Sequence, residues 1–485
     1  MPSLRYFLSM IPLIATASVF AAEPAAPAGK VSYYSDIRPI VQQHCQGCHQ
    51  PAKAQGGYIV TQFAELFKAG NTGKEPIVAG KPDASLLVQQ LLPAAGKPPA
   101  MPKGKEPLPA ATVEKVKRWI AEGATDDTPA SVRLPAVDEE HPPAYELAPV
   151  ITSIDFSPDG SLLAVAGYHE VLLHKGDGSG LVGRLVGASE RIQSVAFSPD
   201  GKSLAVSGGN PARFGEIQVW DVAKKKLRMS VPDSFDTLSG VSWSPDGKKI
   251  AFGCNDNTVR AIDSTSGEQV LYQGAHNDWV LGTTFSLDGT YLVSVSRDRA
   301  MKLIEVATQR FVDNVTSITP GALKGGLAAV AMRPMKERKM VKQANVEVGG
   351  GEHLYNELLT AGADGTPRLY KMHREKKREI GDDANKIRDF EKMPGRVYAL
   401  SFNKDGSQFV AGSSSDGTGE VRIYKTDDGK KLATCEGQKG GVFAVKFHPD
   451  GKLVASAGFD GLVRLNDAAT GKLIKEFSPV PLAKK

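Results

Sequence analysis

The sequence predicts two domains of different class: a small all-α domain near the N-terminus, followed by an all-β propeller of seven blades. Two observations lead to this fold class. A chain of 485 residues exceeds the size of one ordinary hydrophobic core, so we expect at least two domains. From residue 145 onward a short turn motif recurs at a spacing near that of propeller blades, whereas the preceding segment carries apolar stripes at helical spacing.

The first 30 residues are typical of an export signal and a leader. Arg5 gives a basic start, residues 6–20 are mostly apolar, and small residues flank the cleavage point. We therefore expect a signal peptide over residues 1–22, a flexible Ala- and Pro-rich leader over residues 23–30, and a periplasmic or otherwise exported protein. The alternative is an uncleaved membrane anchor, which the short apolar run disfavours.

Composition divides the remaining chain into three segments. We expect the all-α domain over residues 31–127, a linker rich in Pro and acidic residues over 128–144, and the propeller over 145–480. The net charge of +5 is close to balanced for this length, so we expect no nucleic-acid partner. No apolar stretch after the signal reaches transmembrane length, so we expect no membrane span in the cleaved protein.

Two segments of the first domain have the apolar spacing of helices. The first covers residues 36–44, with Ser35 as the expected N-cap. The second covers residues 110–122, where Pro109 opens the helix and Gly123 follows its end. We expect the apolar faces of both helices to line a buried site.

The segment Cys45-Gln46-Gly47-Cys48-His49 has the C-x-x-C-H spacing of a c-type haem attachment site. Two thiols at this spacing bond to the vinyl groups of a haem, and the adjacent imidazole coordinates the iron. We expect one covalent haem c, attached to Cys45 and Cys48, with His49 as the proximal ligand. A redox C-x-x-C would need a thioredoxin-like context and a zinc site a second ligand pair, and the sequence offers neither.

A second axial ligand must come from elsewhere in the domain. Met101 lies in a Pro-rich segment between the haem motif and the second helix, and it is the only Met between Gln50 and Asp127. A thioether ligand favours reduced iron and raises the reduction potential. We expect Met101 as the distal ligand, and the alternative is an open or water-filled position.

The first domain resembles the planctomycete-type cytochrome c domain from about Tyr33 to Ala124. The segments that carry the resemblance are Asp36–Ile40, Cys45–His49, Gly80–Leu87, Met101-Pro102 and Arg118–Ala124. The resemblance implies haem ligation by His49 and Met101 and a role in electron transfer. This sequence departs from the family at Lys103, where a second Pro is usual.

The turn motif F-S-P-D-G and its variants define the repeat of the second domain. They occur at Phe156–Gly160, Phe197–Gly201, Trp243–Gly247, Phe285–Gly289, Phe402–Gly406 and Phe447–Gly451. Pro-Asp-Gly makes a tight turn between two apolar strands, because Gly readily adopts positive φ. The long interval before residue 402 holds a degenerate unit around Ala331–Pro334 and Ala361–Gly365, which gives seven units.

These units resemble the WD-repeat family from about Tyr145 to Val480. Trp220-Asp221 is the one intact WD pair, whereas other units carry Ile262-Asp263, Asn466-Asp467 or no Asp. The resemblance implies a β-propeller of radially arranged sheets that binds a protein ligand or acts as a scaffold. We expect the family's buried polar network in only some of the blades.

Other chemistry-bearing residues are expected to be structural. Cys254 and Cys435 fall in different repeats and are expected as buried thiols rather than a disulfide. Two basic runs, Arg333–Lys342 and Lys371–Arg378, are expected as solvated loops, the alternative being a docking patch for an acidic redox partner. The six propeller histidines are scattered over different blades, and His276 is expected to be structural. They are His169, His174, His276, His353, His373 and His448.

The sequence favours an electron-transfer protein over a catalyst. In this interpretation the haem exchanges electrons with an unidentified redox partner, and the propeller binds a protein or orients the first domain. One alternative is a haem oxidoreductase with a catalytic second site in the propeller, for which the sequence offers no clustered His set or catalytic motif. The other alternative is a haem-based sensor or binding module. We assign no catalytic residue.

Overall fold

The computed structural model describes residues 29–46, 48–50, 53–94, 96–129, 137–317, 323–335, 339–342, 352–377, 379 and 381–483. These residues fall into two compact units, and the chain passes between the units after Gly47, Gln55 and Arg133. The expected signal peptide lies outside the described residues, as do most of the leader and part of the linker. None of the described helices is long and apolar enough to cross a membrane.

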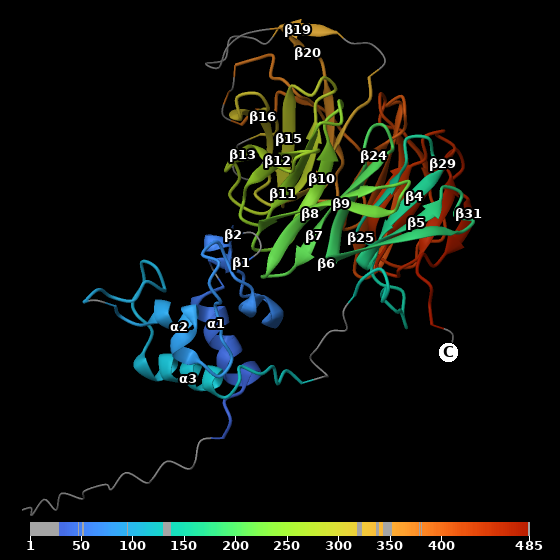
Figure 1. The fold of residues 1–485 in the computed structure, drawn as a ribbon. Coiled ribbons are helices and arrows are strands. Elements are labelled where there is room, and N and C mark those ends of the chain that lie inside the picture. Colours follow the sequence, from blue (N-terminus) through green and yellow to red (C-terminus); the bar gives the residue numbers. More distant parts are fainter. Residues whose placement is uncertain are drawn as a thin grey trace, which may run out of the picture. The chain divides into compact units, whose positions relative to one another are not determined.

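The first unit is helical (Figure 1). A π-helical turn, Tyr33–Ile37, leads into α1 (Arg38–His44), and α2 (Leu86–Leu91) and α3 (Ala110–Ala121) follow. Short 3₁₀ turns occur at Gln55–Gly57, Phe63–Phe67 and Pro82–Ala84. The apolar face of α3 packs with the π-helical turn and α1 in one core, where the Tyr33 and Trp119 rings lie 5.7 Å apart.

The N-cap predicted for the first helix is wrong. Helical structure begins at Tyr33, and Ser32 is the N-cap: its hydroxyl accepts the N–H of Ser35 at 3.0 Å. The Asp36 carboxylate in turn accepts the N–H of Ser32 at 3.0 Å. This reciprocal pair gives hydrogen-bond acceptors to the N–H groups of both Ser32 and Ser35. The helix therefore begins earlier than predicted.

The second predicted helix is confirmed to within a residue. It is α3 (Ala110–Ala121), with Pro109 at the N-cap and Gly123 beyond its end at φ 102°. Helix α2 was not predicted, because six residues are too few to establish a helical period.

The second unit is built from antiparallel β-sheets. A seven-stranded sheet contains β3 (Ile154–Phe156), β4 (Leu162–Ala166), β5 (Tyr168–Lys175), β6 (Leu181–Phe197), β7 (Ser203–Asn210), β8 (Phe214–Asp221) and β9 (Lys226–Ser234). A four-stranded sheet contains β10 (Leu238–Trp243), β11 (Lys249–Cys254), β12 (Val259–Asp263) and β13 (Gln269–Gln273). The next contains β14 (Val280–Phe285), β15 (Tyr291–Ser296), β16 (Met301–Glu305) and β17 (Arg310–Asn314).

Three more four-stranded sheets follow along the chain. The first contains β18 (Leu327–Met332), β21 (Glu357–Gly362), β22 (Arg368–Lys371) and β23 (Lys386–Asp389), with the hairpin β19 (Met340–Lys342) and β20 (Glu352–Leu354) inserted after β18. The second contains β24 (Arg396–Phe402), β25 (Gln408–Ser415), β26 (Thr418–Lys425) and β27 (Lys431–Thr434). The third contains β28 (Val442–Phe447), β29 (Leu453–Gly458), β30 (Val463–Asp467) and β31 (Leu473–Phe477).

The described residues thus form six sheets of four or seven strands, and the expectation of an all-β domain after a helical one is confirmed. The number of sheets differs from the expected seven because the single long strand β6 belongs to two consecutive sequence repeats. Its first part, Leu181–Val186, pairs with β5, and its last part, Arg191–Phe197, pairs mainly with β7. The degenerate sequence repeat is confirmed as a four-stranded sheet that begins with β18.

The first strands of successive repeats contact one another in a closed series. The contacts run from β3 to β6, β10, β14, β18, β24 and β28, and then back to β3. Hydrogen bonds join the two ends of this series: the N–H of Ile151 donates to Gly458 O at 2.9 Å, and the N–H of Ala483 donates to Tyr145 O at 2.8 Å. Lys446 and Asp155 add an ion pair of 2.8 Å between β28 and β3.

The predicted Pro-Asp-Gly turns are also present. In the first of them the hydroxyl of Ser157 and the N–H of Ser161 donate to the Asp159 carboxylate, at 2.5 and 3.0 Å. Gly160 adopts a φ of 75°, which the turn requires and a larger residue rarely accepts. The apolar strands on either side of these turns are buried.

In several sheets a buried arginine forms ion pairs with two acidic residues, where the WD-repeat family's buried polar network was in doubt. Arg464 in β30 is 1% exposed, and its guanidinium contacts Asp460 at 2.6 Å and Glu476 at 2.9 Å. The same arrangement, with an Asp four residues earlier and a second acid, recurs in β12 and β22. Its members are Arg260 with Asp256 and Asp233, and Arg368 with Asp364 and Asp389. We call each such group an arginine clamp.

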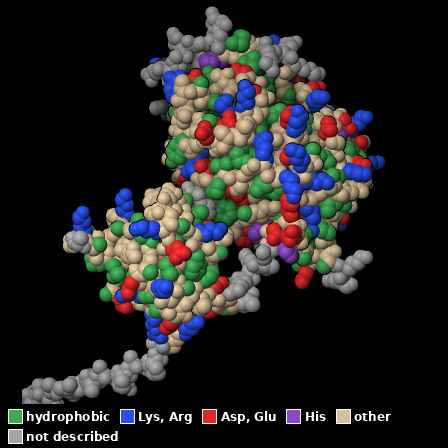
Figure 2. Space-filling model, viewed as in Figure 1, with side chains coloured by type: hydrophobic (Ala, Val, Ile, Leu, Met, Phe, Trp, Pro, Cys, Tyr) green, Lys and Arg blue, Asp and Glu red, His purple; other side chains and the backbone are tan. Residues whose placement is uncertain are grey.

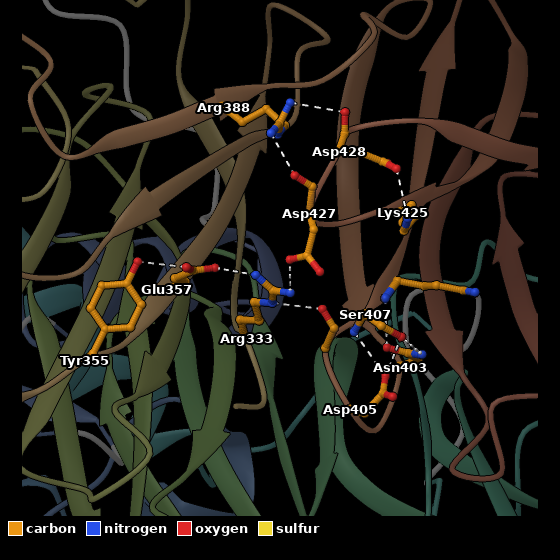
Figure 3. A network of polar contacts seen from close by, with 12 residues as sticks. Arg333, Tyr355, Glu357, Arg388, Asn403, Asp405, Ser407, Lys425, Asp427 and Asp428 are labelled. Carbon is orange, nitrogen blue, oxygen red and sulfur yellow. Dashed lines mark hydrogen bonds and ion pairs between the residues drawn. The ribbon is translucent and has the colours of Figure 1, made fainter. Parts of the chain in front are cut away.

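Two basic residues that were expected in solvated loops are instead paired. Arg333 contacts Glu357 at 2.6 Å and Asp427 at 2.5 Å, and it donates to Gly406 O at 2.8 Å (Figure 3). Arg374 is 2% exposed and makes two hydrogen bonds to Asp382, at 2.9 and 2.7 Å. On the face in Figure 2, Lys and Arg side chains lie among Asp and Glu. These two arginines therefore stabilise the fold and are not free to bind an acidic partner.

We predict that Arg464→Ala lowers the free energy of unfolding of the second unit by roughly 3 kcal/mol, the low end for an ion pair broken on one side, because both carboxylates stay partly exposed. The measurement is urea unfolding of the whole chain, followed by the circular dichroism of the β-sheets. Lys439→Ala is the matched control: Lys439 pairs with the same Glu476 but is 68% exposed, so its removal should cost less than about 1 kcal/mol. Equal losses in the two variants would contradict the clamp.

Candidate functional site

Cys45 lies at the C-terminal end of α1, on the core of the first unit. Its N–H donates to Val41 O at 3.0 Å, and its side chain packs against the cluster that contains Val41 and Trp119. The thiol is free, and burial raises its pKa to about 11. Cys45 is therefore a reduced thiol fixed against an apolar surface.

Met101 belongs to the same unit. Its N–H donates to Gln90 O of α2 at 2.9 Å, and its side chain packs against a second cluster made by Leu91, Leu108 and Val113. The side chain of Met101 is half-buried. The thioether thus lies at the edge of an apolar cluster.

Three residues connect the surroundings of Cys45 and Met101. Ile40, Leu87 and Leu92 pack against both apolar clusters. Cys45 and Met101 therefore border one continuous apolar region of the first unit. An apolar region of this kind suits the faces of a porphyrin, which needs water excluded around its iron.

Cys48 and His49 complete the motif that begins at Cys45. His49 begins the short strand β1 (His49–Gln50), which pairs with β2 (Lys53–Ala54), and the N–H of Gln55 donates to Cys48 O at 3.1 Å. Both side chains are half-buried, and the Cys48 thiol is free. Residues 48–55 group with the second unit, so the division between units falls inside the C-x-x-C-H motif.

The donor set fits the expected cofactor. Two free thiols, one imidazole and one thioether are the groups that c-type attachment and His/Met ligation need. In the part of the chain that the structure describes, no three His, Cys, Asp or Glu side chains gather closely enough to hold a metal ion. The residues of Cys45–His49 and Met101 are thus the candidate cofactor site.

Tyr58 is a buried residue of this region that the sequence did not indicate. Its ring packs against the same cluster as Cys45, and its hydroxyl donates to Leu66 O at 2.9 Å. Burial, together with the nearby Cys45, raises the pKa of the Tyr58 phenol far above its ordinary value. The phenol therefore stays neutral beside the candidate site.

His276 is structural, as expected. Its ring nitrogens lie 2.9 Å from Asp298 and 2.8 Å from the hydroxyl of Ser294, and the ring is buried. Burial alone would raise the pKa of Asp298, but hydrogen bonds from His276 and from two backbone N–H groups lower it to about 2. The carboxylate therefore stays charged and holds the His276 ring in place.

The prediction that all the propeller histidines are scattered is wrong for one pair. The rings of His353 and His373 stack with their centroids 4.3 Å apart. Their sequence positions do not reveal this contact, because His353 lies in an inserted hairpin and His373 follows β22. The other histidines are separate: His174 lies 2.9 Å from Pro479 O, and His448 lies 3.0 Å from Gly160 O.

Both the helical unit and the repeat region contain segments that match known protein families. Residues 45–103 match the planctomycete cytochrome C family. The WD domain, G-beta repeat family matches in five segments: 143–172, 179–211, 267–305, 386–420 and 429–467. Residues 212–281 match the anaphase-promoting complex subunit 4 WD40 domain.

Curated relatives are similar to part of this chain. Eukaryotic translation initiation factor 3 subunit I of Candida glabrata is 24% identical over 193 residues, which is 40% of this chain and 49% of that protein. The same protein of Aspergillus oryzae is 26% identical over 203 residues, 41% of this chain and 53% of that protein. Its counterpart in Coccidioides immitis is 26% identical over 311 residues, 64% of this chain and 76% of that protein. The chain spans about half the length of the first two of these relatives.

We predict that the four cysteines differ in reactivity in protein made without haem attachment. A pulse of alkylating reagent should modify Cys48 first and Cys45 more slowly, because burial raises the pKa of Cys45 to about 11. Cys254 and Cys435 are buried free thiols whose pKa burial raises to about 12, so they should react only after unfolding. Mass spectrometry of the peptides measures all four, and labelling of Cys254 as fast as Cys48 would contradict the prediction.

Proposed function

We propose that this chain, which joins a planctomycete-type cytochrome c domain to WD40 repeats, is an exported c-type cytochrome that transfers electrons. One observation carries the proposal: a C-x-x-C-H motif with both thiols free, one of them fixed on an apolar core. Cysteine is rare in this chain, with four residues in 485, so a motif of this spacing has little chance of being incidental.

Each residue of the site has one role in this proposal. Cys45 and Cys48 attach one haem covalently, His49 is the proximal ligand and Met101 is the distal ligand. The apolar region between Cys45 and Met101 excludes water from the site. When bound, a haem supplies reversible one-electron chemistry, and its Met ligand favours the reduced state.

The second unit is proposed to be a seven-bladed propeller that binds a protein. The closed series of first strands supports seven blades, with β6 contributing to two of them. The curated relatives are named as subunits of an initiation factor, which supports a role in binding other proteins. The proposed partners are thus a redox protein for the first unit and a protein ligand for the repeats.

Export is the remaining part of the proposal. The basic start, apolar run and small residues before residue 23 are those of a secretory signal. Haem is attached to C-x-x-C-H motifs outside the cytoplasm, so the signal and the motif support each other. We propose a periplasmic or otherwise exported location.

The test of haem attachment is expression with a c-type maturation system and an export signal. We expect the purified chain to gain the mass of one haem and to show the spectrum of a c-type haem. Cys45→Ser or Cys48→Ser should reduce covalent attachment by at least tenfold, whereas Cys254→Ser, the matched control, should leave it unchanged. Mature protein without added haem mass would refute the proposal.

The distal ligand has its own test. Met101→Leu keeps an apolar side chain of similar size but removes the sulfur, so we expect the reduction potential to fall by at least ~60 mV, a tenfold change for a one-electron couple. The opened position should also let the reduced protein bind carbon monoxide. Leu108→Ala, which changes the same apolar cluster, is the control and should shift the potential much less. An unchanged potential in Met101→Leu would remove Met101 from the ligand set.

A further inference from the structure

Three aromatic residues of the second unit, the buried Tyr291 and His373 and the half-buried His353, form a cluster apart from the candidate cofactor site. His353 lies in β20, His373 follows β22, and Tyr291 begins β15. The two imidazoles stack with an interplanar angle of 16° and centroids 4.3 Å apart. Tyr291 Oη lies 2.8 Å from His353 Nδ1, and the Tyr291 ring meets His373 edge-on at 4.8 Å. We call these residues the histidine stack.

Part of this cluster lacks hydrogen bonds. His373 is 5% exposed, and among the described residues neither of its ring nitrogens has a hydrogen-bond partner, nor does His353 Nε2. A buried N–H without an acceptor costs free energy, and His373 is held in the stack by ring packing rather than by hydrogen bonds. Packing of this kind suits neutral rings, because two stacked imidazolium cations would repel each other without solvent between them.

The stack joins three structural elements. His353 belongs to the hairpin β19–β20, a separate two-stranded sheet inserted after β18, which Figure 1 shows at the edge of the second unit. His373 directly follows β22 of the four-stranded sheet that carries this insertion, and Tyr291 belongs to the preceding sheet. Contact between His353 and the other two rings therefore fixes β20 against two sheets.

Both acidic and basic side chains lie near the histidine stack. Asp288 in the turn before β15 and Glu305 at the end of β16 favour protonated histidine. Arg310 in β17 faces Tyr291, while Arg374, which follows His373, is held by Asp382 and lies 3.9 Å from Asp313. Burial outweighs the two acids: it lowers the pKa of His353 and, together with His353, lowers the pKa of His373 to about 4.

We propose that the histidine stack is a pH-sensitive latch, which holds β20 against the neighbouring sheets while both rings are neutral and releases it when they are protonated. The sign follows from linkage. A released His373 has an ordinary pKa of ~6.5, so the stack contributes its full stability above that pH and loses it as the pH falls toward 4. From pH 7 to pH 5 the opening equilibrium should rise roughly 20-fold from His373 alone.

A metal site is the competing interpretation of two stacked histidines, one buried and one half-buried. Nearly parallel stacked rings direct their in-plane lone pairs side by side, whereas ligands of one metal ion must converge on it. The described residues also contain no third His, Cys, Asp or Glu close enough to complete such a site. The geometry therefore favours the latch.

Hydrogen exchange of the full chain tests the latch. After correction for the intrinsic effect of pH, protection of the backbone at residues 352–356 should fall about 20-fold between pH 7 and pH 5. His373→Phe keeps an aromatic ring but cannot be protonated, so it should retain protection at both pH values. His174→Phe, at a buried histidine in another sheet, is the matched control and should keep the wild-type pH response.

Three results would overturn the proposal. They are equal protection of residues 352–356 at both pH values, a full pH response in His373→Phe, and a bound metal whose removal alone abolishes protection. Elemental analysis of the purified chain decides the last. If His373→Phe does not fold, His353→Phe provides the same test from the other ring.

Discussion

Each sheet of the second unit depends on its neighbours, because a single four-stranded sheet cannot bury both of its faces. Most of the clusters of buried residues in this unit show this directly, since six of them mix side chains from adjacent sheets. In one of them Ala205 and Val219 of the seven-stranded sheet pack with Phe252 and Ile262 of the next. The last sheet finds its neighbour in the first, where Phe156 packs with Ala455 and Leu465. Closure of the series is thus the condition under which every sheet is stable.

The arginine clamps act within this arrangement. Apolar packing between sheets is non-directional. It therefore fixes the distance between two sheets better than the register of their strands. A guanidinium held between a turn and an outer strand, as in Arg464, joins strands of one sheet by contacts of defined geometry. The intact Trp-Asp pair at Trp220 serves its sheet differently: its indole N–H donates to Gln218, which in turn donates to Glu216. Different side chains therefore meet the same requirement in different repeats.

The features that depend on local sequence were predicted well. The turns at Pro-Asp-Gly, the ends of α3 and the free buried thiols of Cys254 and Cys435 follow from a few adjacent residues or from the scarcity of one residue type. The C-x-x-C-H motif and Met101 were singled out in the same way, and both lie within the residues that match the planctomycete cytochrome C family. Features that need two distant segments were missed. The clamp partner Asp233 lies in a different sheet from Arg260, and His353 of an inserted hairpin meets His373, which follows a strand of another sheet.

The pairing of Tyr145 with Leu482 places the two ends of the second unit side by side. A unit with adjacent ends can be joined to another domain through either end without disturbing its interior. New termini could likewise be opened at an exposed turn such as that around Lys202, with the old ends linked directly. The repeat region can therefore be joined to other domains through either end, and its attachment to a cytochrome c-like domain is one of several fusions that its architecture would permit.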